Sequence, residues 1–390
     1  MELRKADVLF NDRPAGTLEE TVNGGSRFIY APNWQTEIAC AFPIAQREHE
    51  WPLGLHPFFE GLGPEGWLRE KQARSAHINE EDDFGLLLRY GADCIGAVGV
   101  RPQAGDTPNL VPITERTANP RRTLSGVQKK LLVVKDGDHY TPAGPDGPAP
   151  YIAKFNSTNE NHQDLVRNEN LSLRWTAALL GKDEVTAFGL GQVALLNESA
   201  LIVTRFDRTK DGGKLRLEDF AQILQKSKGR DSNGKYDASY EEVAAGIKQH
   251  SSRPEIDLSR FFRRLIACVL VGNADAHLKN FSLLEIGSGL RLSPAYDIVN
   301  TGLYKLDPSI ALAINDKRPH LDEVTRDDLV AFAKAIGLTD QTINYTFTDL
   351  GARARRAASI IKPPPAEPPE GFVNRYAEVV NQACHRILEQ

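Results

Sequence analysis

The fold is decided by the stretch Val271-Gly272-Asn273-Ala274-Asp275-Ala276-His277-Leu278-Lys279-Asn280-Phe281, which follows an apolar run with helical spacing at 258–271. Asp275 and Asn280 stand five residues apart, and a second acid, Asp297, follows in Pro294-Ala295-Tyr296-Asp297-Ile298. A carboxylate can accept the proton of a hydroxyl group, and amide and carboxylate oxygens are the ligands that magnesium prefers. The stretch therefore predicts a site for phosphoryl transfer from ATP.

The spacing of Asp275 and Asn280 is that of a protein-kinase catalytic loop. Such a site needs alignment and charge neutralisation more than covalent chemistry. Asp275 is the candidate base, and Asn280 and Asp297 are the candidate magnesium ligands. Lys154, at the end of a short apolar run, is the candidate phosphate-binding cation, and Glu169, fifteen residues later in a predicted helix, would position it. Each residue alone is commonly a cap or a surface group, so the prediction rests on their shared order.

The stretch Thr123-Leu124-Ser125-Gly126-Val127-Gln128-Lys129-Lys130 is the candidate phosphate loop, because Gly126 allows a close approach to phosphate oxygens. It lacks Walker A spacing, and a polar turn entering a strand is an equal alternative. The glycines of 91–99 lack the acid of a dinucleotide site, and His49-Glu50 lacks the second His of a zinc protease. A metal-hydrolase interpretation of Asp275 and His277 leaves the nearby Lys279 unexplained.

The composition predicts a soluble protein of two or three domains, with 41% hydrophobic and 25% charged residues in 390. No apolar run reaches the roughly 18 residues needed to span a bilayer, and the charged start of the chain indicates no secretion signal. The four cysteines are far apart, which favours reduced thiols and a cytoplasmic location. The net charge of −5 argues against tight DNA binding by this chain alone.

The order of the predicted elements is strands first and helices second. We expect an α+β fold with two kinase-like lobes: an N-terminal subdomain at 1–105, an N-lobe with the phosphate loop and the ATP lysine at 106–216, and a helical C-lobe with the catalytic loop at 217–390. In the first part we expect a strand, a turn and a strand from Val8, then helices at 58–73 and 82–90 with Asp82 or Asp83 as a cap.

The chain resembles the HipA-type toxin serine/threonine kinases. The resemblance covers about residues 6–360 and rests on motifs in the family's order. These are Phe58-Phe59-Glu60-Gly61-Leu62, Gly96-Ala97-Val98, Ser125-Gly126-Val127-Gln128-x-Lys130, Ile152-x-Lys154, Asn168-Glu169, Arg205-Phe206-Asp207-Arg208, Glu218-Asp219, Asn273-x-Asp275-x-His277-x-Lys279-Asn280-Phe281-Ser282, Tyr296-Asp297-Ile298 and Leu312-x-Ile314-Asn315.

The resemblance implies ATP and Mg²⁺ as cofactors and a role for each matching residue. Asp275 and Lys279 are catalytic, and Asn280 and Asp297 hold magnesium. The nucleotide-binding set is Ser125, Gly126, Val127, Gln128, Lys130, Lys154, Glu169, Phe206, Asp207 and His277, with Asp207 near the ribose. Thr123 and Ser125 are both candidates for the family's inactivating autophosphorylation. Thr204 stands where the family often has Glu, before Arg205 in the hinge.

The resemblance also implies partners. It predicts a toxin that phosphorylates a translation component, typically an aminoacyl-tRNA synthetase, and induces growth arrest and persistence. A HipB-like helix-turn-helix antitoxin would bind the kinase and carry the operator-DNA contacts, with no membrane involved. Two alternatives stay open: a catalytically quiet co-repressor that docks the antitoxin on DNA, and a small-molecule kinase of the same fold.

Overall fold

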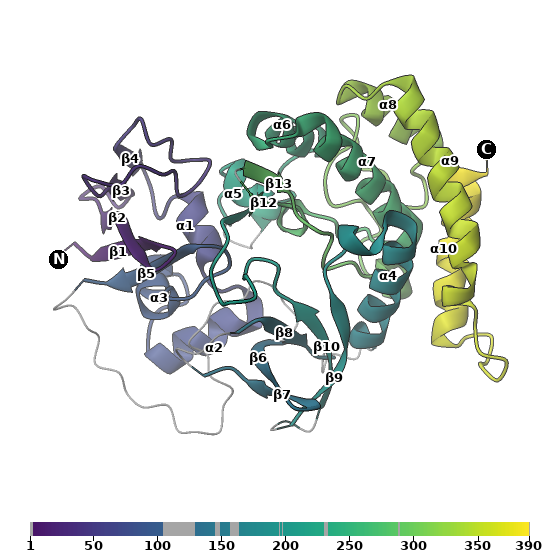
Figure 1. Ribbon diagram of the computed structural model, residues 1–390, viewed down its shortest axis with the longest axis horizontal. Helices are drawn as coiled ribbons and strands as arrows, with labels where there is room; N and C mark the ends of the chain where they lie inside the picture. Colours follow the sequence, from purple (N-terminus) through teal and green to yellow (C-terminus); the bar gives the residue numbers. More distant parts are fainter. Residues whose placement is uncertain are drawn as a thin grey trace. The chain divides into compact units, whose positions relative to one another are not determined.

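A computed structural model describes residues 3–103, 129–144, 149–156, 164–194, 196, 198–229, 233–287 and 289–389. The chain forms two compact units, whose elements are labelled in Figure 1. Unit 1 comprises Met1–Phe155, Gly191–Gly234 and Leu284–Ile286, and unit 2 comprises Asn156–Leu190, Lys235–Leu283 and Gly287–Gln390. The units run across the predicted boundaries at 105 and 216, and the three-part division by role stays a prediction.

Unit 1 begins with a five-stranded antiparallel sheet in the order β4-β3-β2-β1-β5. Its strands are β1 (Lys5–Phe10), β2 (Arg13–Glu20), β3 (Ser26–Tyr30), β4 (Glu48–Trp51) and β5 (Val98–Pro102). Asn11 and Asp12 connect β1 to β2 with positive φ angles of 50° and 60°. Asn and Asp tolerate this left-handed conformation, which suits a tight hairpin. The predicted strand, turn and strand are confirmed.

Three helices lie between β4 and β5 in the chain: α1 (Pro57–Leu62), α2 (Gly66–Ala76) and α3 (Asp83–Tyr90). The predicted cap is confirmed, since the Asp82 carboxylate accepts the Gly85 N–H at 2.9 Å. The same carboxylate also pairs with Arg4, which ties the start of the chain to α3. Aromatic side chains fill the core of this part, with Phe28, Phe42 and Phe59 in mutual ring contact.

The rest of unit 1 contains a closed barrel with the strand order β10-β8-β6-β7-β9. The strands are β6 (Lys130–Asp136), β7 (His139–Pro142), β8 (Tyr151–Lys154), β9 (Phe188–Val193) and β10 (Glu198–Thr204). Apolar residues fill the interior, namely Leu131, Val133, Ala153, Phe155, Val193, Ala200 and Ile202. The short elements β11 (Leu217–Asp219) and α5 (Phe220–Ile223) follow the barrel.

A buried charge network joins two segments of unit 1 that lie far apart in sequence. The Asp207 carboxylate, 3% exposed, accepts the Gly96 N–H at 2.8 Å. It also accepts hydrogen bonds from the guanidinium groups of Arg205 and Arg208. Burial alone raises the pKa of Asp207, but the Arg205 charge and hydrogen bonds outweigh it and hold the pKa below its ordinary value. The carboxylate is therefore ionised and links the hinge segment to the turn before β5.

Unit 2 is mainly helical and is organised around α7 (Pro254–Val271), which packs against α4, α6, α9 and α10 (Figure 1). The other helices are α4 (Leu165–Leu180), α6 (Tyr240–His250), α8 (Arg326–Ala335), α9 (Asp340–Ala357) and α10 (Phe372–Leu388). Short 3₁₀ helices lie at Lys182–Glu184, Leu278–Asn280, Thr301–Leu303 and Ala358–Ile361, and one more, Asn233–Tyr236, runs from unit 1 into unit 2. Apolar residues cover most of α7, as expected for a helix surrounded by neighbours. The candidate catalytic loop is followed by β12 (Ser282–Ile286), of which Leu284–Ile286 belong to unit 1, and by β13 (Gly289–Leu292).

Within the described ranges, no helix combines the length and the apolar character that crossing a bilayer requires. The four cysteines are all free thiols.

We expect Asp207→Asn to lower the free energy of unfolding by about 3–5 kcal/mol at neutral pH, because Arg205 would stay buried beside a neutral amide. A carboxylate with a lowered folded pKa stabilises the protein above its unfolded pKa, and that contribution disappears as the pH falls through the folded value. The penalty of the substitution should therefore shrink in acid. Urea unfolding at several pH values measures both effects.

The matched control is Asp12→Asn, which removes an exposed ion pair to Lys214 in the same unit while keeping a residue suited to positive φ. We expect a change of about 1 kcal/mol or less for this control. Equal stabilities of Asp207→Asn and the parent would show that the buried network does not hold unit 1 together.

Candidate active site

The candidate catalytic loop begins where α7 ends, at Gly272. This residue has φ of 88°, a left-handed conformation that favours glycine. A Cβ atom at this position would lie 2.7 Å from Val379 Cγ1 and 2.8 Å from Asn300 Oδ1. The positive φ angle and the lack of room for a Cβ atom therefore both require glycine at this position, where α7 ends and the loop begins.

Surrounding elements of unit 2 hold the backbone of this loop along its whole length. The hydrogen bonds are Thr301 N–H to Gly272 O (2.9 Å), Ala274 N–H to Thr301 Oγ1 (2.9 Å), Ala311 N–H to Ala274 O (2.8 Å), the Tyr240 hydroxyl to Ala276 O (3.1 Å) and the Tyr296 hydroxyl to Lys279 O (2.8 Å). A loop whose backbone is fixed at four positions loses little further conformational freedom when substrate binds. The arrangement is therefore suited to presenting side chains in fixed positions.

Hydrogen bonds inside the loop orient its polar side chains. The Asn273 side-chain oxygen accepts the Asp275 N–H at 3.1 Å. The Asn280 side-chain oxygen accepts the His277 N–H at 2.9 Å, while the Asn280 N–H donates to the His277 carbonyl oxygen. This reciprocal pairing fixes the Asn280 amide, and since a carbonyl oxygen has two lone pairs, one stays available for a cation.

Asp275 is exposed, so its carboxylate is open to an incoming molecule. Its Oδ1 accepts a hydrogen bond of 2.9 Å from the hydroxyl of Tyr236. The pKa of Asp275 lies above its ordinary value, mainly because surrounding protein atoms desolvate the carboxylate. The charge of Asp297 raises this pKa further, while the Tyr236 hydrogen bond and the Lys235 charge lower it. A carboxylate with a raised pKa is a stronger base than an ordinary aspartate. Tyr236 was not among the residues predicted from the sequence.

Asp297 follows β13 and adopts φ of 57°, in the left-handed region. Three residues later, both the N–H and the carbonyl oxygen of Asn300 form hydrogen bonds with the Asn168 side chain of α4. The Asn168 amide nitrogen donates to Asn300 O, and its oxygen accepts the Asn300 N–H, both at 2.9 Å. Ser172 extends this buried network by donating to the Asn168 oxygen at 3.2 Å. The segment that carries Asp297 is therefore held against α4.

Asp275, Asn280 and Asp297 belong to one compact unit, and the charge of Asp297 acts on Asp275. Hard oxygen donors from one amide and one carboxylate suit Mg²⁺, which binds few protein ligands and keeps waters or phosphate oxygens in its other positions. The donors present therefore fit the predicted metal. Lys279 and His277 lie in the same loop, and His277 is mostly buried, with its ring edge-on to Tyr236 at a centroid distance of 5.3 Å.

The candidate nucleotide-binding cations lie in the barrel of unit 1. Lys154 ends β8 and is 5% exposed. It is the direct register partner of Lys130 on the antiparallel strand β6. Directly opposed residues project from the same face of a sheet. The two lysine side chains are therefore neighbours on one face of the barrel sheet, and their contact with phosphate stays a prediction.

The remaining predicted residues are divided between the units. Glu169 is buried in α4 of unit 2 at 1% exposure. Phe206 and Asp207 lie in unit 1, and the Asp207 carboxylate already accepts the four hydrogen-bonding groups of its network. The ribose contact of Asp207 stays a prediction, and the residue has a structural role in addition. The predicted loop residues Thr123, Ser125, Gly126, Val127 and Gln128 lie outside the described residues.

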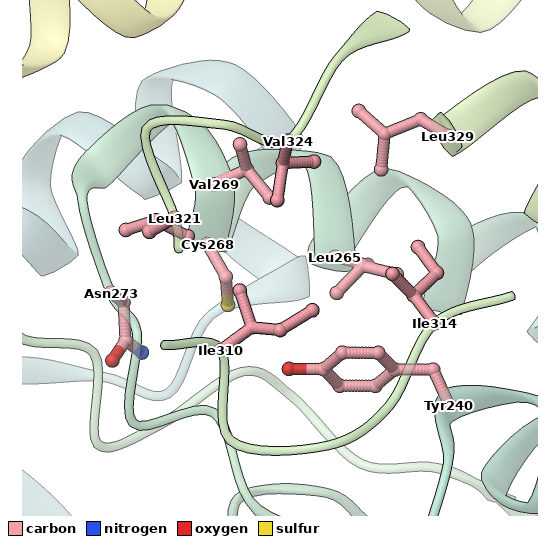
Figure 2. Close-up of a pocket in the computed structure, with 10 residues that line it drawn as sticks. All are labelled: Tyr240, Leu265, Cys268, Val269, Asn273, Ile310, Ile314, Leu321, Val324 and Leu329. Atoms are coloured by element: carbon pink, nitrogen blue, oxygen red, sulfur yellow. The ribbon is translucent and has the colours of Figure 1, made fainter. Parts of the chain in front are cut away.

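A small internal cavity of about 10 Å³ lies beneath the catalytic loop in unit 2 (Figure 2). Asn273 of the loop, Cys268 near the end of α7 and the ring of Tyr240 contribute to its wall, and apolar side chains complete it. The cavity has room for at most about one water molecule. It is therefore a packing defect behind the loop and too small for a nucleotide.

Known proteins resemble this chain over nearly its whole length. The model for the HipA-like C-terminal domain matches residues 122–358, and the model for the HipA N-terminal domain matches residues 6–101. A putative kinase of Sinorhizobium fredii, Y4dM, is 32% identical, with 90% of each chain covered. The serine/threonine-protein kinase toxin HipA of Shewanella oneidensis is 25% identical, covering 85% of this chain and 83% of the relative.

Among solved structures, the Shewanella oneidensis HipA in complex with HipB and its operator DNA is similar. It has a TM-score of 0.76 and 23% identity, with 98% of this chain and 97% of that chain covered. This likeness confirms the predicted α+β fold of the two-lobed kinase type. The domain matches, the relatives and the shared fold together establish that the chain is a protein kinase and belongs to the HipA family of serine/threonine kinase toxins.

Proposed function

We propose that this chain is an ATP- and Mg²⁺-dependent serine/threonine kinase in which Asp275 is the general base. The observation that carries the proposal is the loop 272–280, which holds Asp275 exposed on a backbone anchored by its neighbours. The acceptor hydroxyl would give its proton to Asp275 as its oxygen attacks the terminal phosphorus of ATP, and ADP would leave. Lys279 would add positive charge beside the transferred group.

Asn280 and Asp297 would hold magnesium, which neutralises phosphate charge when bound. Lys154 and Lys130 would contact the phosphates, supported by their opposed positions on β8 and β6. The remaining nucleotide contacts proposed are Ser125, Gly126, Val127, Gln128, Glu169, Phe206, Asp207 and His277. Their support is the family motif that each residue matches.

The biological proposal is a toxin of a toxin–antitoxin module in the cytoplasm. The similar Shewanella protein is a toxin whose solved complex contains HipB and operator DNA. We therefore propose a HipB-like helix-turn-helix antitoxin as partner and operator DNA bound through it. The net charge of −5 supports DNA contacts made mainly by that partner. An aminoacyl-tRNA synthetase or another translation component is the proposed protein substrate, and growth arrest with persistence is the proposed outcome.

The same solved complex favours one alternative, a co-repressor that docks its antitoxin on DNA without catalysis. Expression of the chain without an antitoxin distinguishes the two functions. A kinase arrests growth, and Asp297→Ala relieves the arrest by removing a magnesium ligand. A passive scaffold gives the same growth with either form.

We expect Asp275→Asn to slow transfer of label from γ-labelled ATP to protein by about a hundredfold or more, the usual contribution of a general base. The fold should be unaffected, because the loop is held by backbone bonds that this side chain does not make. The matched control is Asp327→Asn, an exposed aspartate in the first turn of α8, which should transfer label at the parent rate. Parent-like transfer by Asp275→Asn rules out the base assignment.

We further propose that phosphorylation at Thr123 or Ser125 inactivates the enzyme. A phosphate group adds nearly two negative charges to a segment that would bind ATP phosphates, and like charges repel. Intact-mass analysis of active and inactive fractions, with the variants Thr123→Ala and Ser125→Ala, identifies the modified hydroxyl. Full activity in a stoichiometrically phosphorylated sample contradicts this regulation.

A further inference from the structure

The hydroxyl of Tyr236 lies 2.9 Å from Oδ1 of Asp275 and donates a hydrogen bond to it. A general base must lie about 2.6–3.2 Å from the oxygen whose proton it takes. Tyr236 therefore places a hydroxyl group at the distance from Asp275 that a substrate hydroxyl needs. Both residues belong to unit 2, so the contact is internal to one compact unit.

The neighbourhood of Tyr236 keeps this hydroxyl beside the loop. The Tyr236 ring lies edge-on to His277, with a centroid distance of 5.3 Å, and the Lys235 ammonium lies 5.2 Å from the ring centre. The Arg318 guanidinium donates to the Tyr236 carbonyl oxygen. Three residues later, Ser239 caps α6 through a capping box with Glu242, which fixes the chain that follows. The tyrosine is thus carried on an anchored segment.

The contact is nevertheless accessible and replaceable. Asp275 is exposed, Tyr236 is half-buried, and their hydrogen bond is open to solvent. A hydrogen bond to a charged group in such a place shifts an equilibrium by roughly tenfold. A substrate hydroxyl that forms the same bond can therefore displace the phenol, but it must compete with it first.

We propose that Tyr236 is an internal competitor for the acceptor site, a gate whose hydroxyl occupies Asp275 until a substrate hydroxyl replaces it. This inference rests on the proposed role of Asp275 as the base. The gate raises the KM for the protein acceptor and leaves the turnover of bound substrate unchanged, because Tyr236 has left the base when transfer occurs. The gate therefore selects among protein acceptors, because only an acceptor that makes further binding contacts with the kinase displaces the Tyr236 hydroxyl efficiently.

The contact itself is tested without any kinase activity. N-acetylimidazole acetylates accessible tyrosine hydroxyls, and peptide mass spectrometry of the full chain follows the rate at Tyr236. A phenol that donates to a carboxylate reacts more slowly than a free one, so we expect Asp275→Ala, which leaves no acceptor oxygen at this position, to accelerate acetylation of Tyr236 several-fold. Tyr345, which is 66% exposed on α9, is the internal reference and should react equally in both proteins. Equal rates at Tyr236 overturn the gate, whatever the fate of the base assignment.

The kinetic test uses Tyr236→Phe, which removes the hydroxyl and keeps the ring beside His277. With dephosphorylated casein as acceptor, we expect KM for casein to fall about three- to tenfold, the loss of one competing hydrogen bond. The kcat and the KM for ATP should stay within about twofold of the parent values. The control Tyr345→Phe removes an exposed hydroxyl from α9 and should leave all three constants unchanged.

Other outcomes exclude the gate in distinguishable ways. A fall in kcat with unchanged KM for casein makes Tyr236 a residue that positions Asp275. Phosphotyrosine at position 236 after incubation with ATP makes it a substrate. Parent-like transfer by Asp275→Asn, combined with accelerated acetylation of Tyr236 in Asp275→Ala, contradicts the proposed function. The contact would then exist, but Asp275 would not be the base.

Discussion

The hydrogen bonds that hold the backbone from Gly272 to Lys279 are the constraint on which the candidate site depends. The partners are Thr301, Ala311, Tyr240 and Tyr296, so several segments of unit 2 position the loop. The Asn168 side chain adds the corresponding constraint on the segment with Asp297. Phosphoryl transfer relies on alignment, and these contacts supply alignment before any ligand binds.

Much of this organisation could be predicted because it follows from local patterns. The apolar periodicity before Asn273 predicts α7, and the Asp82 cap and the Asn11-Asp12 turn follow from preferences of single residues. The offset of Asp275 and Asn280 is likewise a local property. The assignment to a family could be predicted too, because it depends on the order of such motifs and not on their packing.

The parts that escaped prediction are those that depend on partners distant in sequence. Tyr236 stands 39 residues before Asp275, and nothing in its local sequence distinguishes it from other tyrosines. Asp207 matched a family motif, but its bond to Gly96 spans 111 residues and shows a structural role that the motif does not reveal. The opposition of Lys130 and Lys154 depends on strand register, which short apolar runs do not determine.

The opposed lysines on β6 and β8 have a consequence for the energetics of unit 1. Their side chains are held on one face of the barrel sheet, where one anion can lie near both. If the proposed phosphate group binds there, it binds only the folded barrel, so its occupancy and the folding of unit 1 are thermodynamically linked. The resistance of unit 1 to proteolysis would then rise with the concentration of that ligand.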